Sequence, residues 1–203
     1  MNDPHVQERR RVEAFVEATF DRAYGSRIST HYPTLMSVQD ECGRIYAVAG
    51  FRFARESTLF LEQYLDQPVE TALEKVKGDV LPRTAIAEIG NLASDGRGAS
   101  LFLFLSLASH LRDAGCEYAV ATTTRELRGI FARTGFPIAE LGRADPTRLP
   151  DGGQSWGAYY EADPVVVAGS IAETLSPLSR FAAGEPTPRG VRSRLHYSGS
   201  RSE

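Results

Sequence analysis

The sequence TAIAEIGNLASDGRGAS, residues 84–100, changes character near its midpoint. Its first part belongs to a predicted central strand, Arg83 to Ala93, which is mainly small and apolar apart from Glu88 and Asn91. Polar groups inside a buried strand need hydrogen-bond partners, so these two residues require an explanation. The second part is a glycine-rich turn that leads into an apolar helix ending near Ala114. The stretch therefore predicts a strand, turn and helix in succession.

The glycine-rich turn has the features of an anion-binding site. Free backbone N–H groups and the positive end of the helix dipole can hold a phosphate, and Arg97 can add a charge-assisted contact. The turn matches neither the Walker loop nor the three-glycine dinucleotide fingerprint, which argues against nucleotide hydrolysis and nicotinamide binding. The alternative is a turn that merely starts a helix. The binding interpretation assigns these residues to a phosphate-bearing ligand: Leu92, Ala93, Ser94, Arg97, Gly98, Ala99 and Ser100.

The flanking segments predict a mixed α/β order. Apolar residues recur at helical spacing or in short β-branched and aromatic runs, with glycine and proline between them. A loop from Gly142 to Gly153 is long enough to form a substrate flap. The predicted elements are a helix over Val12–Tyr24, a β-hairpin ending in Ile45–Phe53, a helix over Pro68–Lys77, a strand over Glu117–Thr122, a helix over Arg125–Arg133 and strands over Ile138–Leu141 and Trp156–Tyr160.

Length and composition predict one domain. The chain has 203 residues, and we expect a folded unit over 12–183, a flexible N-terminus over 1–11 and a disordered tail over 184–203. A net charge of -3 argues against a nucleic-acid partner. No apolar run approaches the roughly 20 residues that span a bilayer, so no integral membrane association is expected. The cysteine spacing predicts no metal site, and the absence of a secretory signal favours a cytoplasmic location.

The turn and its surroundings resemble the acyl-CoA site of the GCN5-related N-acetyltransferase (GNAT) superfamily. The superfamily loop, Gln/Arg-x-x-Gly-x-Gly/Ala, falls on Asp95, Gly98 and Ser100, where the glycine matches and the first position is acidic. The segment Arg125 to Phe136 is similar to the next superfamily helix, with Phe131 where many members carry a tyrosine general acid. A phenyl ring cannot donate a proton, so any acid must come from elsewhere.

This resemblance implies a single GNAT-like acyltransferase domain with a central mixed, mostly antiparallel sheet flanked by helices. It also implies an acyl-CoA or a phosphopantetheine-carried acyl thioester as cosubstrate, with no tightly bound cofactor. An acyl carrier protein is a possible partner, because the acidic Asp95 would repel a pyrophosphate. The acceptor would be a small-molecule amine.

Four further motifs resemble the thermostable hemolysin family, which is similar to acyltransferases near the acyl-homoserine-lactone synthases. The resemblance spans about Phe15 to Ser179 and implies acyl transfer to an amine by direct attack. The family name suggests a membrane-active cytolysin instead, and a non-catalytic binding module is a third reading. The motifs are His31-Tyr32-Pro33, Gly50-Phe51-Arg52, Glu62-Gln63-Tyr64-Leu65 and Glu88-Ile89-Gly90-Asn91-Leu92-Ala93.

Glu88 is the predicted proton acceptor, because burial beside the thioester raises a carboxyl pKa toward the useful range. Its alternative is a structural carboxylate paired with Arg52 or another arginine. Backbone N–H groups near Leu92 to Ser94 would polarise the thioester carbonyl. Glu62 and Tyr64 would face one side if their segment is extended. The candidate substrate-binding residues are His31, Arg52, Glu62, Tyr64 and Asn91, each of which could instead serve structure alone.

Overall fold

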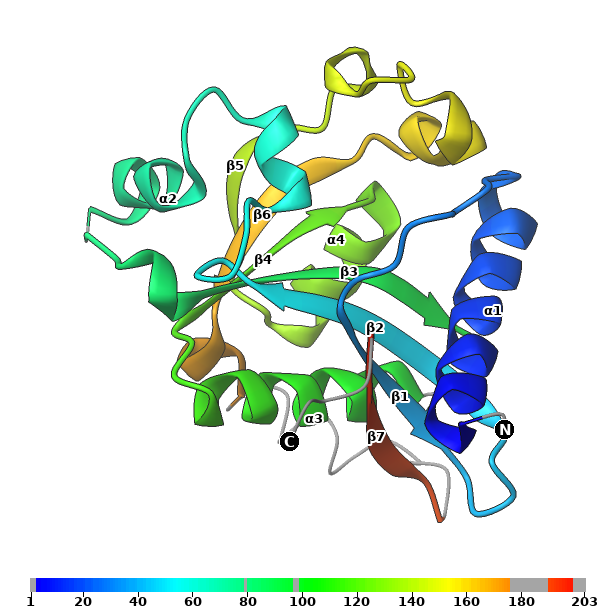
Figure 1. The fold of residues 1–203 in the computed structure, drawn as a ribbon. Coiled ribbons are helices and arrows are strands. Elements are labelled where there is room, and N and C mark those ends of the chain that lie inside the picture. Colours follow the sequence, from blue (N-terminus) through cyan, green and yellow to red (C-terminus); the bar gives the residue numbers. More distant parts are fainter. Residues whose placement is uncertain (1–2, 79, 97–98, 176–189, 199–203) are drawn as a thin grey trace.

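A computed structural model describes residues 3–78, 80–96, 99–175 and 190–198. Seven strands form one sheet in the order β5-β6-β4-β3-β2-β1-β7 (Figure 1). The β3–β4 pair is parallel and the other described pairs are antiparallel, which confirms the predicted mixed, mostly antiparallel sheet. The strands are β1 Thr34–Gln39, β2 Ile45–Phe53, β3 Ile86–Ser94, β4 Tyr118–Thr123, β5 Ala139–Arg143, β6 Val165–Ser170 and β7 Arg192–Tyr197.

Helices cover both faces of the sheet, as Figure 1 shows for α1 in blue and α3 in green. Successive strand residues point to opposite faces, so Leu35 of β1 packs in the α1 cluster and Met36 packs in the α3 cluster. This arrangement confirms the predicted α/β class with flanking helices. The helices are α1 Pro4–Tyr24, α2 Val69–Lys77, α3 Ala99–Asp113 and α4 Arg125–Thr134, with 3-10 segments η1 Phe60–Tyr64, η2 Arg83–Ala85, η3 Pro146–Arg148 and η4 Gln154–Ala162.

The N-terminal segment differs from the expected flexible arm over 1–11. Helix α1 begins at Pro4, where the Asp3 carboxylate accepts a hydrogen bond from the His5 N–H at 2.9 Å and caps the helix. Arg9 is buried because its guanidinium donates to backbone carbonyls outside the helix. These carbonyls belong to Tyr32, Pro33 and His196. Arg9 therefore holds this segment against the rest of the fold.

The predicted tail also contains structure. Strand β7 lies within the segment expected to be disordered, and it pairs with β1 in antiparallel register from Thr34 opposite Tyr197 to Gln39 opposite Arg192. Its His196 is buried, and the His196 Nε2 lies 2.8 Å from the Ser37 Oγ. The edge of β1 supplies backbone hydrogen-bond partners for this segment, and amino-acid composition alone does not indicate such partners. The remaining tail residues, 184–189 and 199–203, lie outside the described part of the chain.

The strand predicted between β5 and β6 is wrong. Trp156–Tyr160 was expected as a strand, but it lies in η4, and the neighbouring strand is β6, which the sequence reading missed. Gly157 has φ 55, and a Cβ there would lie 2.1 Å from the carbonyl oxygen of Tyr24, so only glycine fits. The expected flap over Gly142–Gly153 contains the end of β5 and the 3-10 segment η3.

Gly129→Ala is expected to stabilise the protein by about 0.5–1 kcal/mol, because Gly129 lies inside α4 and alanine restricts the unfolded chain. A Cβ there would meet only the far end of the Arg133 side chain, at 3.4 Å. Urea denaturation of both proteins measures the difference. The matched variant Gly78→Ala should destabilise instead, since Gly78 ends α2 with φ 82. A loss of stability in Gly129→Ala would contradict the helix assignment.

Candidate functional site

The two parallel strands at the centre of the sheet separate before they end. Their pairing runs from Ile86 opposite Tyr118 to Ile89 opposite Ala121. Beyond this point β3 continues to Ser94 and β4 to Thr123 without further pairing between them. The sheet therefore opens between its two central strands at their carboxyl ends.

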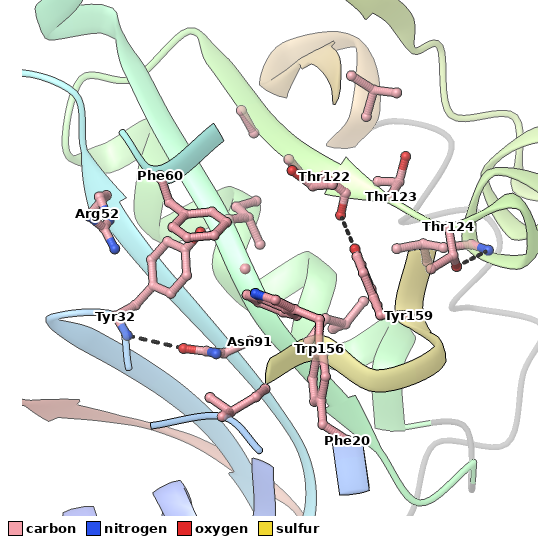
Figure 2. A pocket seen from close by; sticks show the side chains of 18 of the residues that line it. Phe20, Tyr32, Arg52, Phe60, Asn91, Thr122, Thr123, Thr124, Trp156 and Tyr159 are labelled. Carbon is pink, nitrogen blue, oxygen red and sulfur yellow. Dashed lines mark hydrogen bonds between the residues drawn. The ribbon is translucent and has the colours of Figure 1, made fainter. Parts of the chain in front are cut away.

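A cavity of about 690 Å³ occupies this opening and reaches both faces of the sheet. Figure 2 shows Tyr32, Arg52 and Asn91 on one side of the cavity, with Thr122–Thr124 and Tyr159 on the other. Its size falls within the range of ligand sites. We call its two parts the α1 arm, lined by Phe20, Tyr24, Tyr32, Phe60, Trp156 and Tyr159, and the α3–α4 arm, lined by Phe104, Leu107, Ala108, Ile130, Phe131 and Phe136.

The two arms differ in chemistry. The α1 arm combines aromatic rings with polar groups that include Arg27, Arg52, Gln63 and Asn91. The α3–α4 arm is apolar, and Phe131 forms part of its wall, with ring centroids 5.2 Å from Phe136 and 6.0 Å from Phe104. Phe131, where the sequence resemblance implied a position often held by tyrosine, thus contributes apolar surface. One arm suits an apolar chain, and the other suits a ligand with polar and aromatic groups.

Glu88 lies in the middle of β3 and is 1% exposed. Its carboxylate accepts hydrogen bonds from the backbone N–H groups of Phe60 at 2.9 Å and Leu61 at 2.8 Å, and Arg52 Nε lies 3.4 Å away. Burial raises the pKa of Glu88, although these contacts and the Tyr32 hydroxyl act against the rise. The ion pair with Arg52 is present. Glu88 itself does not line the cavity, whereas Arg52, Phe60 and Tyr32 do.

Asn91 has a left-handed backbone conformation with φ 47 and lies at an irregularity in the β2–β3 pairing. Asparagine tolerates this conformation better than most residues. Its side-chain oxygen accepts a hydrogen bond from the Tyr32 N–H at 3.0 Å, and Asn91 lines the cavity. The structure therefore places Asn91 at the site, in a bond to backbone.

Tyr64 also lines the cavity, and its hydroxyl lies 2.6 Å from that of Tyr160. Burial, followed by the hydrogen bond to Tyr160, raises the pKa of Tyr64 well above the usual tyrosine range. The hydroxyl is therefore neutral and already has a partner. Its ring stays available as cavity wall.

Glu62 is not where the sequence reading placed it. Because η1 is a 3-10 segment, Glu62 and Tyr64 do not share a face, and Glu62 does not line the cavity. Its carboxylate instead accepts from Arg83 at 2.7 Å and from the N–H groups of Leu59 and Val69. Burial would raise the pKa of Glu62, but these bonds outweigh it and lower the pKa to about 2.

Glu62→Gln is expected to lower the free energy of unfolding at neutral pH by about 2 kcal/mol, since Arg83 loses one of its two carboxylate partners and keeps only Glu70. The wild-type advantage is fully present above the ordinary glutamate pKa of 4.5 and is lost as the pH falls toward about 2. Urea denaturation of both proteins across this range measures it. An advantage that stays constant down to the acid end would contradict the assignment.

His31 is also misplaced by the sequence reading, since its ring faces α1 and it does not line the cavity. The His31 Nε2 lies 2.8 Å from the Glu17 carboxylate, an ion pair when the ring is protonated. The neighbouring Tyr32 does line the cavity. Sequence reasoning missed Tyr32 as a site residue, although it stands in the motif His31-Tyr32-Pro33 and its side chain packs on Gly50 and Gly90 of two other motifs.

The predicted phosphate turn is described in part. Leu92, Ser94 and Ser100 line the cavity, and the Ser100 Oγ donates to the Ser94 Oγ at 2.8 Å. Ala99 begins α3 and is buried, and Ala93 packs in the α1 core cluster. Arg97 and Gly98 lie outside the described residues. The end of β3 and the start of α3, on either side of this turn, thus border the cavity.

Within the described ranges, no helix combines the length and the apolar character needed to cross a membrane. In the same residues, no group of three or more His, Cys, Asp or Glu side chains is placed to hold a metal ion. Cys42 is exposed and Cys116 is buried, and both are free thiols.

Several solved structures are similar to this chain. FeeM, an N-acyl amino acid synthase from uncultured soil microbes, has a TM-score of 0.59 at 13% identity, covering 84% of this chain and 95% of that one. MesI, a CoA-dependent acyl-homoserine lactone synthase, has a TM-score of 0.55 at 15% identity, covering 89% and 91%. BjaI, another such synthase, solved with SAM and isopentyl-CoA, has a TM-score of 0.54 at 18% identity, covering 89% and 82%.

These likenesses show that the chain shares the fold of these synthases. A search of curated proteins found no match. The family model for thermostable hemolysin matches residues 2–175, which is most of the chain. The protein therefore belongs to the thermostable hemolysin family.

Proposed function

We propose that this protein is an N-acyltransferase that moves an acyl group from a thioester to a small-molecule amine. The observation that carries the proposal is the cavity that crosses the sheet where β3 and β4 separate. It gives a thioester and an amine access to one point from opposite faces. The fold shared with acyl-homoserine lactone and N-acyl amino acid synthases supports this chemistry.

In this proposal the acyl chain lies in the α3–α4 arm and the amine approaches through the α1 arm. The apolar lining of the first suits a hydrocarbon chain, and the aromatic and polar lining of the second suits an amine with polar substituents. The donor is an acyl-CoA or an acyl carrier protein, taken from the cytoplasm. Its phosphate end would lie at the turn formed by Ser94, Arg97, Gly98, Ala99 and Ser100.

The proposed reaction is a direct attack. The amine nitrogen forms a bond to the thioester carbonyl carbon, the carbon–sulfur bond breaks, and a thiolate leaves. Backbone N–H groups in the Leu92–Ser94 stretch would stabilise the oxyanion. Glu88 would accept the proton that the amine loses, because its buried carboxyl has a raised pKa. Arg52, Tyr64 and Asn91 would line the place where the acceptor binds.

The test measures free thiol released by the purified protein from acetyl, butanoyl, octanoyl and dodecanoyl thioesters of CoA and of acyl carrier protein. Each donor is assayed with and without a panel of amines, and mass spectrometry identifies the amide. Amine-dependent thiol release with a matching amide is the expected result. If no donor gives amine-dependent thiol or an amide, the proposal is overturned. Leakage of dye-loaded lipid vesicles caused by the same protein would then favour a cytolysin.

A further inference from the structure

Tyr32 occupies a place that two strands keep open for it. Gly50 of β2 and Gly90 of β3 are cross-strand partners beneath its side chain. A Cβ at Gly90 would lie 2.5 Å from three atoms of the Tyr32 ring and hydroxyl, and one at Gly50 would lie 2.7 Å from its Cβ. Both distances are shorter than real carbon contacts. The paired glycines therefore let this ring lie directly on the backbone of the sheet.

Three further contacts fix the ring. The Tyr32 N–H donates to the Asn91 side chain, as Figure 2 shows, and the Arg52 guanidinium lies 4.5 Å from the ring centroid. Glu88 and Gly90 alternate along β3 and so face the same side of the sheet, which places the Tyr32 hydroxyl, packed against Gly90, beside the Glu88 carboxyl, whose pKa it lowers. Because the backbone N–H, the ring face and the hydroxyl of Tyr32 each have a partner, the side chain is held in one orientation. That orientation joins the cavity wall to the buried carboxylate.

The route from the cavity to Glu88 passes through few groups. Glu88 does not line the cavity, and the cavity-lining residues in contact with it are Tyr32, Arg52 and Phe60. The Phe60 contact is a backbone N–H, which donates only. An arginine guanidinium donates hydrogen bonds and accepts none. The Tyr32 hydroxyl can both accept and donate, so it is the group of the three that can carry a proton inward.

We infer that Tyr32 is the catalytic relay that passes the proton of the attacking amine to Glu88. This inference rests on the proposed acyltransferase function. As the nitrogen–carbon bond forms, the amine proton moves to the Tyr32 oxygen and the Tyr32 hydroxyl proton moves to the Glu88 carboxylate. The carbon–sulfur bond then breaks, and the thiolate takes a proton from solvent water. Tyr32 ends each turnover neutral, and Glu88 later returns its proton by the same route.

The ionisation of the surroundings agrees with a relay. Burial, and then the charge of Glu88, raise the pKa of Tyr32 well above its ordinary value, so the hydroxyl stays neutral. The other titratable and charged groups that face this pair are Arg52 of β2, Tyr64 of η1 and Tyr159 of η4. Neither tyrosine ionises near neutral pH. The protonation state of the pair is therefore set by Glu88.

The test is Tyr32→Phe, which keeps the ring and removes the hydroxyl. With the best donor and amine, kcat should fall by about 10–100-fold while the donor KM stays within about twofold. The acid limb of the pH–rate profile, which reports ionisation of Glu88, should be lost. Tyr46→Phe is the matched control, because Tyr46 bonds Asp40 at 2.9 Å and does not line the cavity. Its kinetics should match those of the wild type.

An active wild type with a Tyr32→Phe variant of equal kcat, or with its acid limb intact, overturns the relay and leaves the proposed function standing. An inert wild type overturns both. A readout independent of activity is the carboxyl NMR titration of Glu88, whose pKa should rise in Tyr32→Phe because a hydrogen bond that lowers it is gone. An unchanged Glu88 pKa also contradicts the relay.

A second variant tests whether the position of the Tyr32 hydroxyl matters, as distinct from its presence. Gly90→Ala retains Tyr32 but forces its ring from the sheet, and kcat should fall at least as far as in Tyr32→Phe. Gly129→Ala, the same substitution in α4, should leave kcat unchanged. Full activity in Gly90→Ala would show that the position of the hydroxyl is irrelevant.

Discussion

Glu88→Gln is expected to lower kcat/KM for acyl transfer by about 10²–10⁴-fold, the usual contribution of a positioned proton acceptor. Glutamine fills the same space but cannot take up a proton at neutral pH. Its amide also presents an N–H₂ group to the backbone donors of Phe60 and Leu61, so one contact becomes donor against donor. The measurement is steady-state thiol release with the amine that gives the fastest wild-type rate.

Glu62→Gln is the matched control for this loss. It makes the same chemical change, removes a carboxylate that also accepts from backbone N–H groups, and lies in the same part of the chain. It does not line the cavity, so it should lose stability and keep its kcat at temperatures where the variant is folded. A Glu88→Gln variant that is folded and as active as Glu62→Gln would remove Glu88 from the mechanism.

The second large effect concerns the donor chain. Because the α3–α4 arm is apolar, each buried methylene should add about 0.8 kcal/mol to transition-state binding until the arm is full. The four methylenes between butanoyl and octanoyl donors would then raise kcat/KM by about 200-fold. Initial rates across a series of acyl thioesters measure this slope. A preference for acetyl donors would contradict the assignment of this arm.

Ala108→Phe tests at a single position whether the acyl chain lies in the α3–α4 arm. Ala108 is buried on α3 and lines the arm, so a phenyl group there should remove most octanoyl activity and leave butanoyl activity close to wild type. Ala132→Phe on the exposed surface of α4 is the control, with no expected change in chain preference. Equal loss for short and long donors would indicate general damage to the fold.

The sequence predicted the central part of the fold because its signals there are local. Small and apolar residues followed by a glycine-rich turn and an apolar run define β3 and α3. The segments it missed depend on distant partners. Strand β7 is polar and exposed at most positions, and its place in the sheet comes from pairing with β1. The extent of α1 depends on carbonyls that Arg9 meets only in the folded chain.

The same distinction holds for the site. Glu88, Asn91 and the turn after β3 could be found because they break a pattern within one segment. Glu62 was misassigned because an extended segment and a 3-10 segment place alternate residues differently. The role of Tyr32 could not be predicted, since its position depends on Gly50, Gly90 and Asn91. Such a contact joins residues that are far apart in the sequence, so no residue spacing within one segment predicts it.

The late position of β7 affects how this protein is synthesised. Ser37 and His196 are hydrogen-bonded between neighbouring strands, yet they are 159 residues apart in the chain. During translation the outer edge of β1 therefore emerges from the ribosome long before the strand that covers it. An uncovered edge is a template for pairing with other nascent chains. Crowded polysomes making this protein are consequently exposed to co-translational aggregation until the last strand has left the exit tunnel.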